Sequence, residues 1–239
     1  MGRTHAASGG LAFAASAPLL SVLGIDLSAV GLAVGVVAAA GAALLPDLDH
    51  PSSTVARALG PLSGALARIV AAVSGGHRHG THSLVGVASF TVLAVLADQV
   101  GTAGRTVVAV LLLVLASAGL HLRLSRPPIL HLAVCGLVGF VLIAACPAVS
   151  VGVIPAAVAI GAATHLLGDA LTREGIPILW PFRHDRVRLA TLKTGGLAER
   201  LLIGPGMLVA ACVLIWHLTG GAAATDLYGV VVHTTSGAR

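Results

Sequence analysis

The chain has 239 residues, of which 56% are hydrophobic and only 10% are charged. An average soluble domain carries about 25% charged residues, so this composition is typical of an integral membrane protein. The formal net charge is +5 and aromatic residues make up 3% of the chain. Positive loops at a cytoplasmic membrane surface explain that charge, and no nucleic-acid partner is expected.

Apolar runs of about 17 to 20 residues recur along the chain, and each is long enough to cross a hydrocarbon core of roughly 30 Å. We predict an all-α fold: a polytopic membrane helix bundle of about seven transmembrane helices, with an additional interfacial segment. A single domain is expected over residues 1–220, followed by a short tail over 221–239. The expected spans are residues 6–24, 28–46, 82–100, 105–121, 128–146, 150–168 and 201–219.

The segment 54–74 differs from these runs. Arg57 and Arg68 interrupt it, and Gly60-Pro61 divides it in two. Charged residues are rare within spans, and a Gly-Pro pair is typical of a turn. The segment is therefore expected to be an interfacial pair of helices or a re-entrant segment, rather than a span.

Lysine and arginine residues predict the orientation of the bundle. With the N-terminus in the cytoplasm, 12 of the 14 basic residues fall in cytoplasmic loops, and only Arg105 and Arg239 lie outside. The positive-inside rule favours this arrangement, and the opposite orientation would invert it. A multi-pass protein of the inner (plasma) membrane is expected. This topology also places His5 and three polar motifs on the cytoplasmic side.

The first motif, LLPDLDHPSS, follows the second span. Asp47 and Asp49 stand two positions apart, and His50 comes next. Carboxylate oxygens and imidazole nitrogens are ligands for zinc, manganese or iron, so these three residues are candidate metal ligands. The alternative is a polar turn in which an aspartate caps the next helix while Pro51 and Ser52 begin it.

The second motif, HRHGTHS, precedes the third span and holds three histidines within six positions. Neutral imidazole is the commonest protein ligand for such metals, and histidine also transfers protons near neutral pH. His82 is a candidate ligand. His77 and His79 are candidate catalytic residues that would orient or protonate a leaving group. The alternative is an interfacial loop that responds to pH or to lipid phosphate.

The third motif, HLLGDALTREG, ends the sixth span. His165 and Asp169 are four residues apart, so they share one face of a helix, as paired metal ligands do in helical zinc enzymes. His5, at the cytoplasmic end of the first span, is a further candidate ligand. A hydrogen-bonded pair that closes a helix end is the alternative, although an ionisable pair in a span indicates function because its burial is costly.

The run WPFRHDRVRLATLKTGGLAER, residues 180–200, combines aromatic and basic side chains. Such a segment suits the headgroup level of a membrane and could hold an anionic lipid. Arg183 and Arg186 are therefore candidate substrate-binding residues. The alternative is ordinary charge that sets the topology.

In this order, the N-terminal histidine and the three motifs resemble the YdjM-like family of bacterial inner-membrane proteins, over about residues 3–185. The resemblance implies a membrane-bound, metal-dependent hydrolase. It also implies LPDxDHP, HRxxTHS and HxxxD elements, whose polar members are here Asp47, Asp49, His50, His77, His82, His165 and Asp169. His79 is not part of that pattern. A looser likeness in ligand types, to zinc phospholipase C enzymes, is an analogy.

These observations predict a hydrolase in which a divalent metal ion, zinc or alternatively manganese or iron, activates water. Because the motifs lie at the membrane surface, a membrane lipid is the expected partner. A phospholipid or a lipid-linked phosphate or ester at the cytoplasmic face is the expected substrate. A non-enzymatic ion or lipid transporter, or a metal-binding membrane protein, is the alternative, because the same residues could bind ions or relay protons.

Overall fold

The computed structural model of the chain describes residues 2–58, 60–122, 128–144 and 151–192, residue 196 and parts of 205–216. These residues form an all-α fold, as predicted, and residues 171–192 add two isolated β-bridges. Most of the expected span 201–219 and the whole of the tail 221–239 lie outside the described residues. The elements are α1 (Gly2–Ala15), α2 (Ala17–Val22), α3 (Ala29–Ala42), η1 (Pro46–Asp49), α4 (Pro61–Ser74), η2 (Gly80–His82), α5 (Leu84–Gln99), α6 (Thr102–Gly119), α7 (Pro128–Ala144) and α8 (Val153–Ala170), of which η1 and η2 are 3₁₀ helices.

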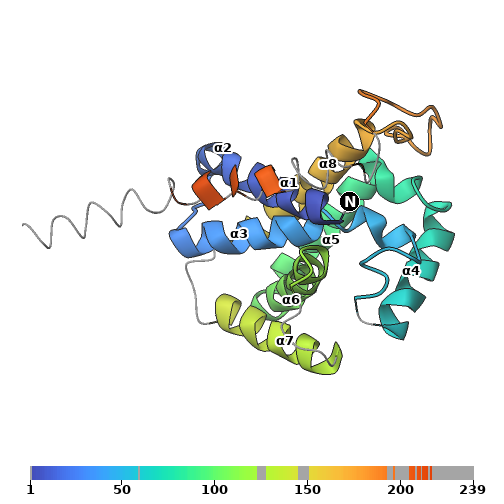
Figure 1. Ribbon diagram of the computed structural model, residues 1–239. Helices are drawn as coiled ribbons and strands as arrows, with labels where there is room; N and C mark the ends of the chain where they lie inside the picture. The colour runs from blue at the N-terminus through green and yellow to red at the C-terminus, as the bar shows by residue number, and fades with distance from the viewer. Residues whose placement is uncertain are drawn as a thin grey trace, which may run out of the picture.

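Helix α3 lies in the middle of the bundle and contacts α1, α6 and α8, while α7 packs on α6 and α5 packs on α8 (Figure 1). Glycines allow the close approach of these helices. A Cβ atom at Gly41 of α3 would overlap the carbonyl oxygen of Leu112 in α6, and one at Gly161 of α8 would overlap that of Ala39 in α3. Small residues at such crossings are typical of membrane helices, which associate through tight packing.

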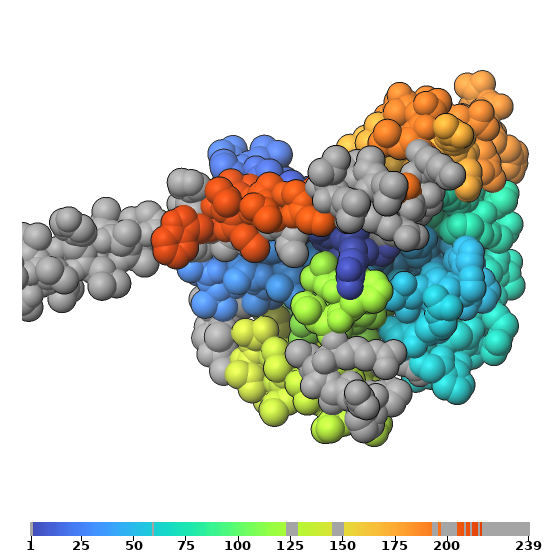
Figure 2. Space-filling model, viewed as in Figure 1, coloured from blue at the N-terminus to red at the C-terminus, as the bar shows by residue number. Residues whose placement is uncertain are grey.

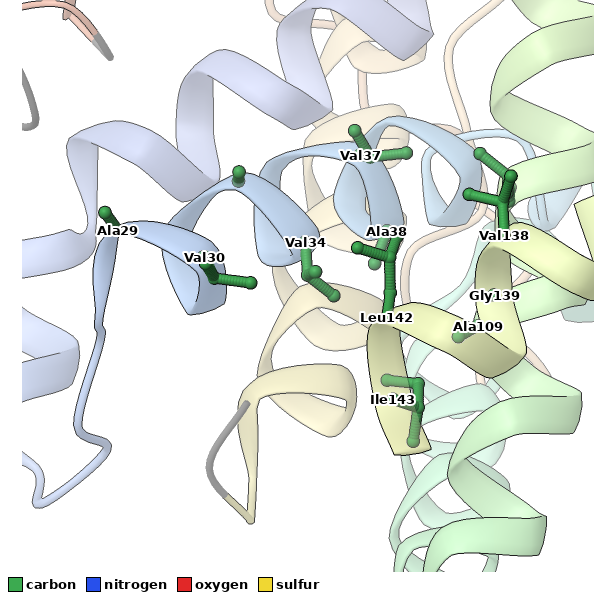
Figure 3. Close-up of a pocket in the computed structure, with 12 residues that line it drawn as sticks. Ala29, Val30, Val34, Val37, Ala38, Ala109, Val138, Gly139, Leu142 and Ile143 are labelled. Atoms are coloured by element: carbon green, nitrogen blue, oxygen red, sulfur yellow. The ribbon is translucent and has the colours of Figure 1, made fainter. Parts of the chain in front are cut away.

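Apolar side chains fill the core and also cover the outside of the bundle. Phe13 and Leu112 are fully buried, whereas Leu93, Val107 and Ile129 are exposed on α5, α6 and α7. Exposed large apolar residues over many helices are expected where the solvent is lipid rather than water. An apolar cavity of about 650 Å³ lies between α3, α6 and α7, along the part of α3 farther from η1 (Figure 3).

Three helical stretches within the described residues are long and apolar enough to cross a membrane, judged by length and composition: Ala29–Asp49, Thr102–Gly119 and Val153–Ala170. Helices α4 and α5 and most of α7 are apolar but shorter. The expected number of seven spans therefore remains a prediction.

The first expected span is divided, because α1 ends at Ala15 and α2 begins at Ala17. Pro18 lacks the backbone N–H that would bond to the carbonyl of Ala14, so the hydrogen-bond ladder is interrupted there. The hydroxyl of Ser16 donates to the carbonyl oxygen of Ala12 at 2.7 Å. Such back-bonding accompanies bends in helices.

The expected interfacial segment holds one helix instead of a pair. Helix α4 begins at Pro61, a favoured first helical position, directly after Gly60 with a positive φ of 62°. Most of the residues between η1 and α4 form turns. One face of α4 exposes a row of large apolar side chains to the surroundings: Leu62, Leu66, Ile69 and Val73. This amphipathic pattern suits the membrane interface, where its placement remains a prediction.

The chain path brings four helix ends together. The start of α1, the end of α3, the start of α5 and the end of α8 meet at the same end of the bundle, where η1 contacts both η2 and α8 (Figure 1). The segment after α8 folds back over this end, and the N–H of Leu84 donates to the carbonyl of Ile178 at 3.0 Å. Figure 2 shows this segment in orange at the upper right of the molecule, directly above the teal-green atoms of the region around η2 and α5.

Candidate metal centre

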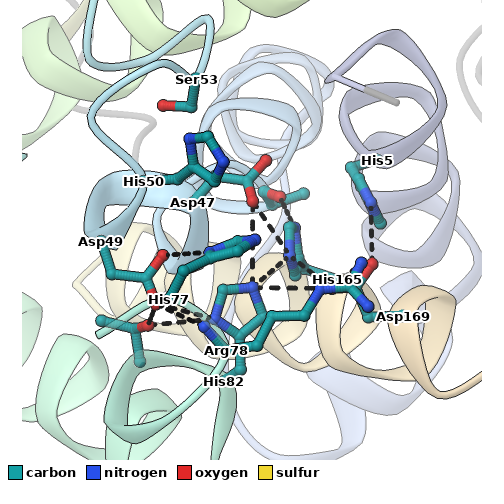
Figure 4. A network of polar contacts seen from close by, with 12 residues as sticks. His5, Asp47, Asp49, His50, Ser53, His77, Arg78, His82, His165 and Asp169 are labelled. Atoms are coloured by element: carbon teal, nitrogen blue, oxygen red, sulfur yellow. Dashed lines mark hydrogen bonds and ion pairs between the residues drawn. The ribbon is translucent and has the colours of Figure 1, made fainter. Parts of the chain in front are cut away.

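The structure brings together His5 and side chains from all three polar motifs at this end of the bundle (Figure 4). Asp47 and Asp49 lie on η1, and His82 ends η2. His165 and Asp169 lie one turn apart near the end of α8. Because each element ends or begins here, residues far apart in the sequence share one pocket.

Four ligand-type atoms from η1, η2 and α8 lie close to one another. The Nε2 atoms of His82 and His165 are 3.3 Å apart. Asp169 Oδ2 lies 3.6 Å from the first and 3.7 Å from the second. Asp47 Oδ1 lies 3.8 Å from each. A tetrahedral ion with bonds of about 2.0–2.2 Å holds its ligand atoms about 3.3–3.6 Å apart, and these five distances are close to that range.

Hydrogen bonds fix the orientation of both histidines. His165 Nδ1 lies 2.7 Å from the carbonyl oxygen of Ala43, which can only accept, so this nitrogen carries the hydrogen. His82 Nδ1 lies 3.2 Å from Asp49 Oδ2 and 3.0 Å from the hydroxyl of Thr81. Because that hydroxyl donates to Asp49, it accepts from His82. In their neutral forms, both rings therefore present bare Nε2 atoms to the group.

With neutral histidines, this arrangement gathers lone pairs and negative charge that a cation would balance. Two Nε2 lone pairs face each other at 3.3 Å, with two carboxylates beside them. With neutral histidines, the three aspartates and Arg78 leave a formal charge of −2 in the cluster, and Asp49 and Asp169 are almost completely buried. Uncompensated buried charge is costly, and one divalent ion would neutralise it.

Asp49 is surrounded by donors. Its Oδ1 atom accepts from His77 Nδ1 at 2.8 Å. Its Oδ2 atom accepts from the backbone N–H of Arg78 at 3.0 Å and from Thr81, and it lies 3.2 Å from His82 Nδ1. A carboxylate with this many partners is well placed to orient a ligating histidine from behind. Asp49, His77 and His82 also form a second group of ligand-type atoms within 4.8 Å of one another.

His5 lies at the edge of the tetrahedral group. Its ring stacks on that of His165, with centroids 4.0 Å apart, and its Nε2 lies 3.4 Å from Asp169 Oδ1. Gly168 leaves the space for this ring, because a Cβ atom there would lie 3.1 Å from His5 Cε1. His5 can thus hold Asp169 in place or join a group of three ligand-type atoms with His165 and Asp169.

The other predicted residues lie farther from the group. His50 Nδ1 lies 2.9 Å from the hydroxyl of Ser52, and its ring meets that of His77 edge-on. His79 Nδ1 lies 3.0 Å from the carbonyl oxygen of His77, outside the carboxylate network. Arg183 and Arg186 are exposed on the segment after α8, and Arg183 pairs with Asp185.

Sequence reasoning missed three participants. Arg78 was counted only as a charge that sets topology, although its Nη2 lies 3.1 Å from Asp169 Oδ2. Thr81 links Asp49 to His82, and the carbonyl of Ala43 orients His165. Arg78 and Thr81 stand inside the motif HRHGTHS, so their place between its histidines was a usable signal. The role of a backbone carbonyl has no signal in the sequence.

The fold and the site define a helical membrane protein with a buried histidine and aspartate centre at one end of its bundle. The model of the YdjM inner membrane protein family matches residues 1–124 and 128–234. The chain therefore belongs to this family, and the match extends well beyond the three motifs. No curated protein and no solved structure matches the chain significantly.

Proposed function

We propose that the protein is a membrane-bound, metal-dependent hydrolase of a phospholipid or a lipid-linked phosphate or ester, acting at the cytoplasmic face. The fixed orientation of two histidines carries this proposal. His82 and His165 use their Nδ1 atoms for hydrogen bonds to oxygen acceptors and turn both Nε2 atoms toward Asp47 and Asp169. Histidines that bind metal are usually held this way by a second shell of acceptors.

The donor set supports the identity of the cofactor. Two imidazole nitrogens and two carboxylate oxygens suit zinc, and they also suit manganese or iron. Asp47, His82, His165 and Asp169 would hold the ion, while His5 and Asp49 would support Asp169 and His82. Such an ion, when bound, acidifies a water molecule and polarises a phosphoryl or acyl oxygen.

His77 is placed to move a proton. Its Nδ1 atom bonds to Asp49 Oδ1 at 2.8 Å, which leaves its Nε2 atom available. The side chain is 35% exposed, whereas His82 and His165 are fully buried. A histidine held by a carboxylate and open to solvent can give a proton to a leaving group or take one from water.

The place of the cluster in the bundle favours an enzyme over a carrier. Alternating-access carriers bind their cargo near the middle of the membrane, usually at broken helices. Here the ligand-type atoms lie at the ends of α3 and α8 and in the short helices next to them. The apolar row on α4 lies on the same segment between η1 and η2, and it supports a lipid as the substrate.

Metal analysis combined with a lipid panel tests the proposal. We expect purified full-length protein, loaded with zinc or manganese in detergent, to retain stoichiometric metal and to cleave a lipid ester or phosphate. His82→Ala should lose both properties, because it removes one ligand and its orienting contacts. His79→Ala is the matched control and should keep the metal, since His79 lies outside the carboxylate network.

Elemental analysis reports the metal, and the mass of the products reports cleavage. A wild-type protein that holds no stoichiometric metal would contradict the metal centre. Retained metal with intact lipids throughout, together with metal-dependent flux across vesicles, would contradict the hydrolase and favour the carrier.

A further inference from the structure

Arg78 is a buried cation beside the proposed ligand group. Its backbone has a positive φ of 59°, a conformation that non-glycine residues seldom adopt. The backbone N–H of the same residue donates to Asp49 Oδ2 at 3.0 Å, which helps to hold this conformation. The side chain is only 7% exposed and is directed toward Asp169 and the end of α8 (Figure 4). The chain thus places a buried guanidinium directly beside the ligand group.

The guanidinium has unused binding capacity. Nη2 pairs with Asp169 Oδ2 at 3.1 Å. Nη1 pairs with Glu174 Oε2 at 3.2 Å and lies 3.4 Å from the hydroxyl of Thr172. The Nε atom is buried and has no hydrogen-bond partner. An arginine fork offers five N–H donors, and a buried donor without a partner is costly.

Glu174 is the replaceable partner of Arg78. Its side chain is 64% exposed, whereas the Asp169 side chain is 2% exposed. An ion pair with one partner in water contributes little to stability and can open readily. If Glu174 moves away, Nη1 of Arg78 becomes available next to the atom Asp169 Oδ2, which belongs to the ligand group.

We propose that Arg78 binds the phosphoryl group of the substrate in the position that the Glu174 carboxylate occupies in this structure. This inference rests on the proposed hydrolase and narrows its substrate class from esters in general to phosphate esters. Glu174 then competes with the substrate for Arg78, and Arg78 is a substrate-binding residue of the same site.

The chemistry of the guanidinium favours phosphate over a carboxylic ester. Arginine binds phosphate oxygens in a bidentate, charge-assisted manner, whereas an ester carbonyl is neutral and offers a single acceptor. A tetrahedral phosphoryl group can also present one oxygen to Arg78 and another to the neighbouring ligand group. A purely structural role, in which Arg78 only balances Asp169, does not explain the pairing with an exposed glutamate or the unpartnered Nε.

Phosphate binding, measured without turnover, tests the inference. Full-length protein loaded with zinc in detergent is titrated with inorganic phosphate and with a soluble short-chain phosphatidic acid by calorimetry. We expect Glu174→Gln to bind phosphate about tenfold more tightly than the wild type, because the competing charge is gone. Arg78→Gln should bind it at least tenfold more weakly, and Arg78→Lys should fall between, because lysine lacks the fork.

Matched controls lie on the exposed segment after α8. Asp185→Asn removes an acidic charge and Arg188→Gln a basic one, and neither should change phosphate affinity by more than about twofold, because exposed charges are screened. Metal content is measured for each variant, so that a loss of metal is not mistaken for a loss of phosphate binding. Comparison of inorganic phosphate with phosphatidic acid shows which kind of phosphate the site prefers. Tighter binding of phosphatidic acid would identify a lipid headgroup, and tighter binding of inorganic phosphate would identify free phosphate.

Two outcomes would overturn the inference. The first is metal-loaded Arg78→Gln that binds phosphate as the wild type does. The second is binding that Arg183→Gln abolishes and Glu174→Gln leaves unchanged, which would place the anion on the exposed segment. Both outcomes are measured as phosphate binding and not as hydrolysis. A protein that fails to hydrolyse lipids would contradict the proposed function without producing either outcome, so the two proposals are tested separately.

Discussion

At the scale of single residues, Asp49 holds several groups of the candidate metal centre in place. It is completely buried, it accepts from His77, Arg78 and Thr81, and it lies 3.2 Å from His82 Nδ1. These four partners belong to one short stretch of the chain, so a single carboxylate contacts the proposed proton donor, a proposed ligand and the backbone of the proposed phosphate-binding arginine. Asp47 differs, because it is partly exposed and faces the two bare Nε2 atoms.

The role of His77 leads to a prediction for His77→Gln. The variant should retain the metal, because His77 is not part of the tetrahedral group, while kcat for the lipid substrate should fall by about 10²–10⁴-fold. Steady-state hydrolysis and elemental analysis of the same preparation measure both properties. His184→Gln, an exposed change on the segment after α8, is the control and should behave as the wild type. Loss of metal in His77→Gln would instead identify His77 as a ligand.

Residue types at the site were predictable from the sequence to different degrees. The spacing of His165 and Asp169 on one helix face, and the clustering of His77 and His82, indicated the ligand-type side chains directly. The division into ligands and supporting residues was not predictable, because it depends on distances between η1, η2 and α8. The acceptor of His165 is a backbone carbonyl, and every residue type provides one.

At the scale of the elements, the two short 3₁₀ helices carry residues of the candidate metal centre. Helix η1 follows the end of α3, and η2 precedes the start of α5. Pro46 begins η1 and Ser83 caps α5 by accepting from the N–H of Gly86 at 3.2 Å. The same hydroxyl donates to the carbonyl of Gly80 at 2.6 Å. His82 is therefore fixed between η2 and α5 by its neighbours. The polar residues on η1 and η2 precede or follow long apolar helices, so the fold can hold them without breaking a span.

The tight crossing of α3 and α6 leads to a prediction about stability. In Gly41→Ala the new Cβ would meet the backbone of Leu112, which cannot rotate away, so the helices must separate. We expect a loss of about 1–3 kcal/mol in unfolding free energy, as for other overpacked cores. Thermal unfolding in detergent with excess chelator measures this loss without a contribution from bound metal.

Gly136→Ala in α7 is the matched control, because nothing lies within 4 Å of a Cβ atom at that position. Alanine is a better helix former than glycine, so this variant should be unchanged or more stable by about 0.5–1 kcal/mol. Equal behaviour of the two variants would show that the crossing is not tight in the folded protein.

Helix positions were largely predictable, whereas the interruptions within helices were less so. Long apolar runs located α3, α5, α6, α7 and α8 to within a few residues. The break at Ser16 was missed because a single proline in an apolar run does not always interrupt a membrane helix. The turns before α4 were missed because the apolar residues in that stretch resemble those of a short helix.

At the scale of the whole molecule, most basic residues that the structure describes lie at the same end of the bundle as the candidate metal centre. Of the nine lysine and arginine residues that the structure describes, only Arg105 lies at the opposite end, where its Nε pairs with Asp98 Oδ1 at 2.8 Å. The other eight lie on α1, on α4 or on the segments around the candidate metal centre. Two features of the sequence, the basic residues and the candidate ligand motifs, thus mark the same end of the bundle.

This asymmetry predicts that the candidate metal centre faces the cytoplasm, because basic residues remain on that side during insertion. Single cysteines test the prediction in a chain whose native Cys135, Cys146 and Cys212 are replaced by alanine. Thr102→Cys, at the exposed start of α6, should react with an impermeant maleimide added to intact cells. Asp185→Cys, on the exposed segment after α8, should react only after the membrane is permeabilised.

Labelling of both variants in denatured protein is the control for expression and intrinsic reactivity. The inverse pattern, with Asp185→Cys reactive from outside, would place the centre on the external face. The proposed substrate would then have to be a lipid of the outer leaflet, while the metal centre and the role of Arg78 would be unaffected. Labelling of both sites in intact cells would contradict a bundle that separates its two ends across the membrane, because both ends cannot face the same compartment when the helices between them span it.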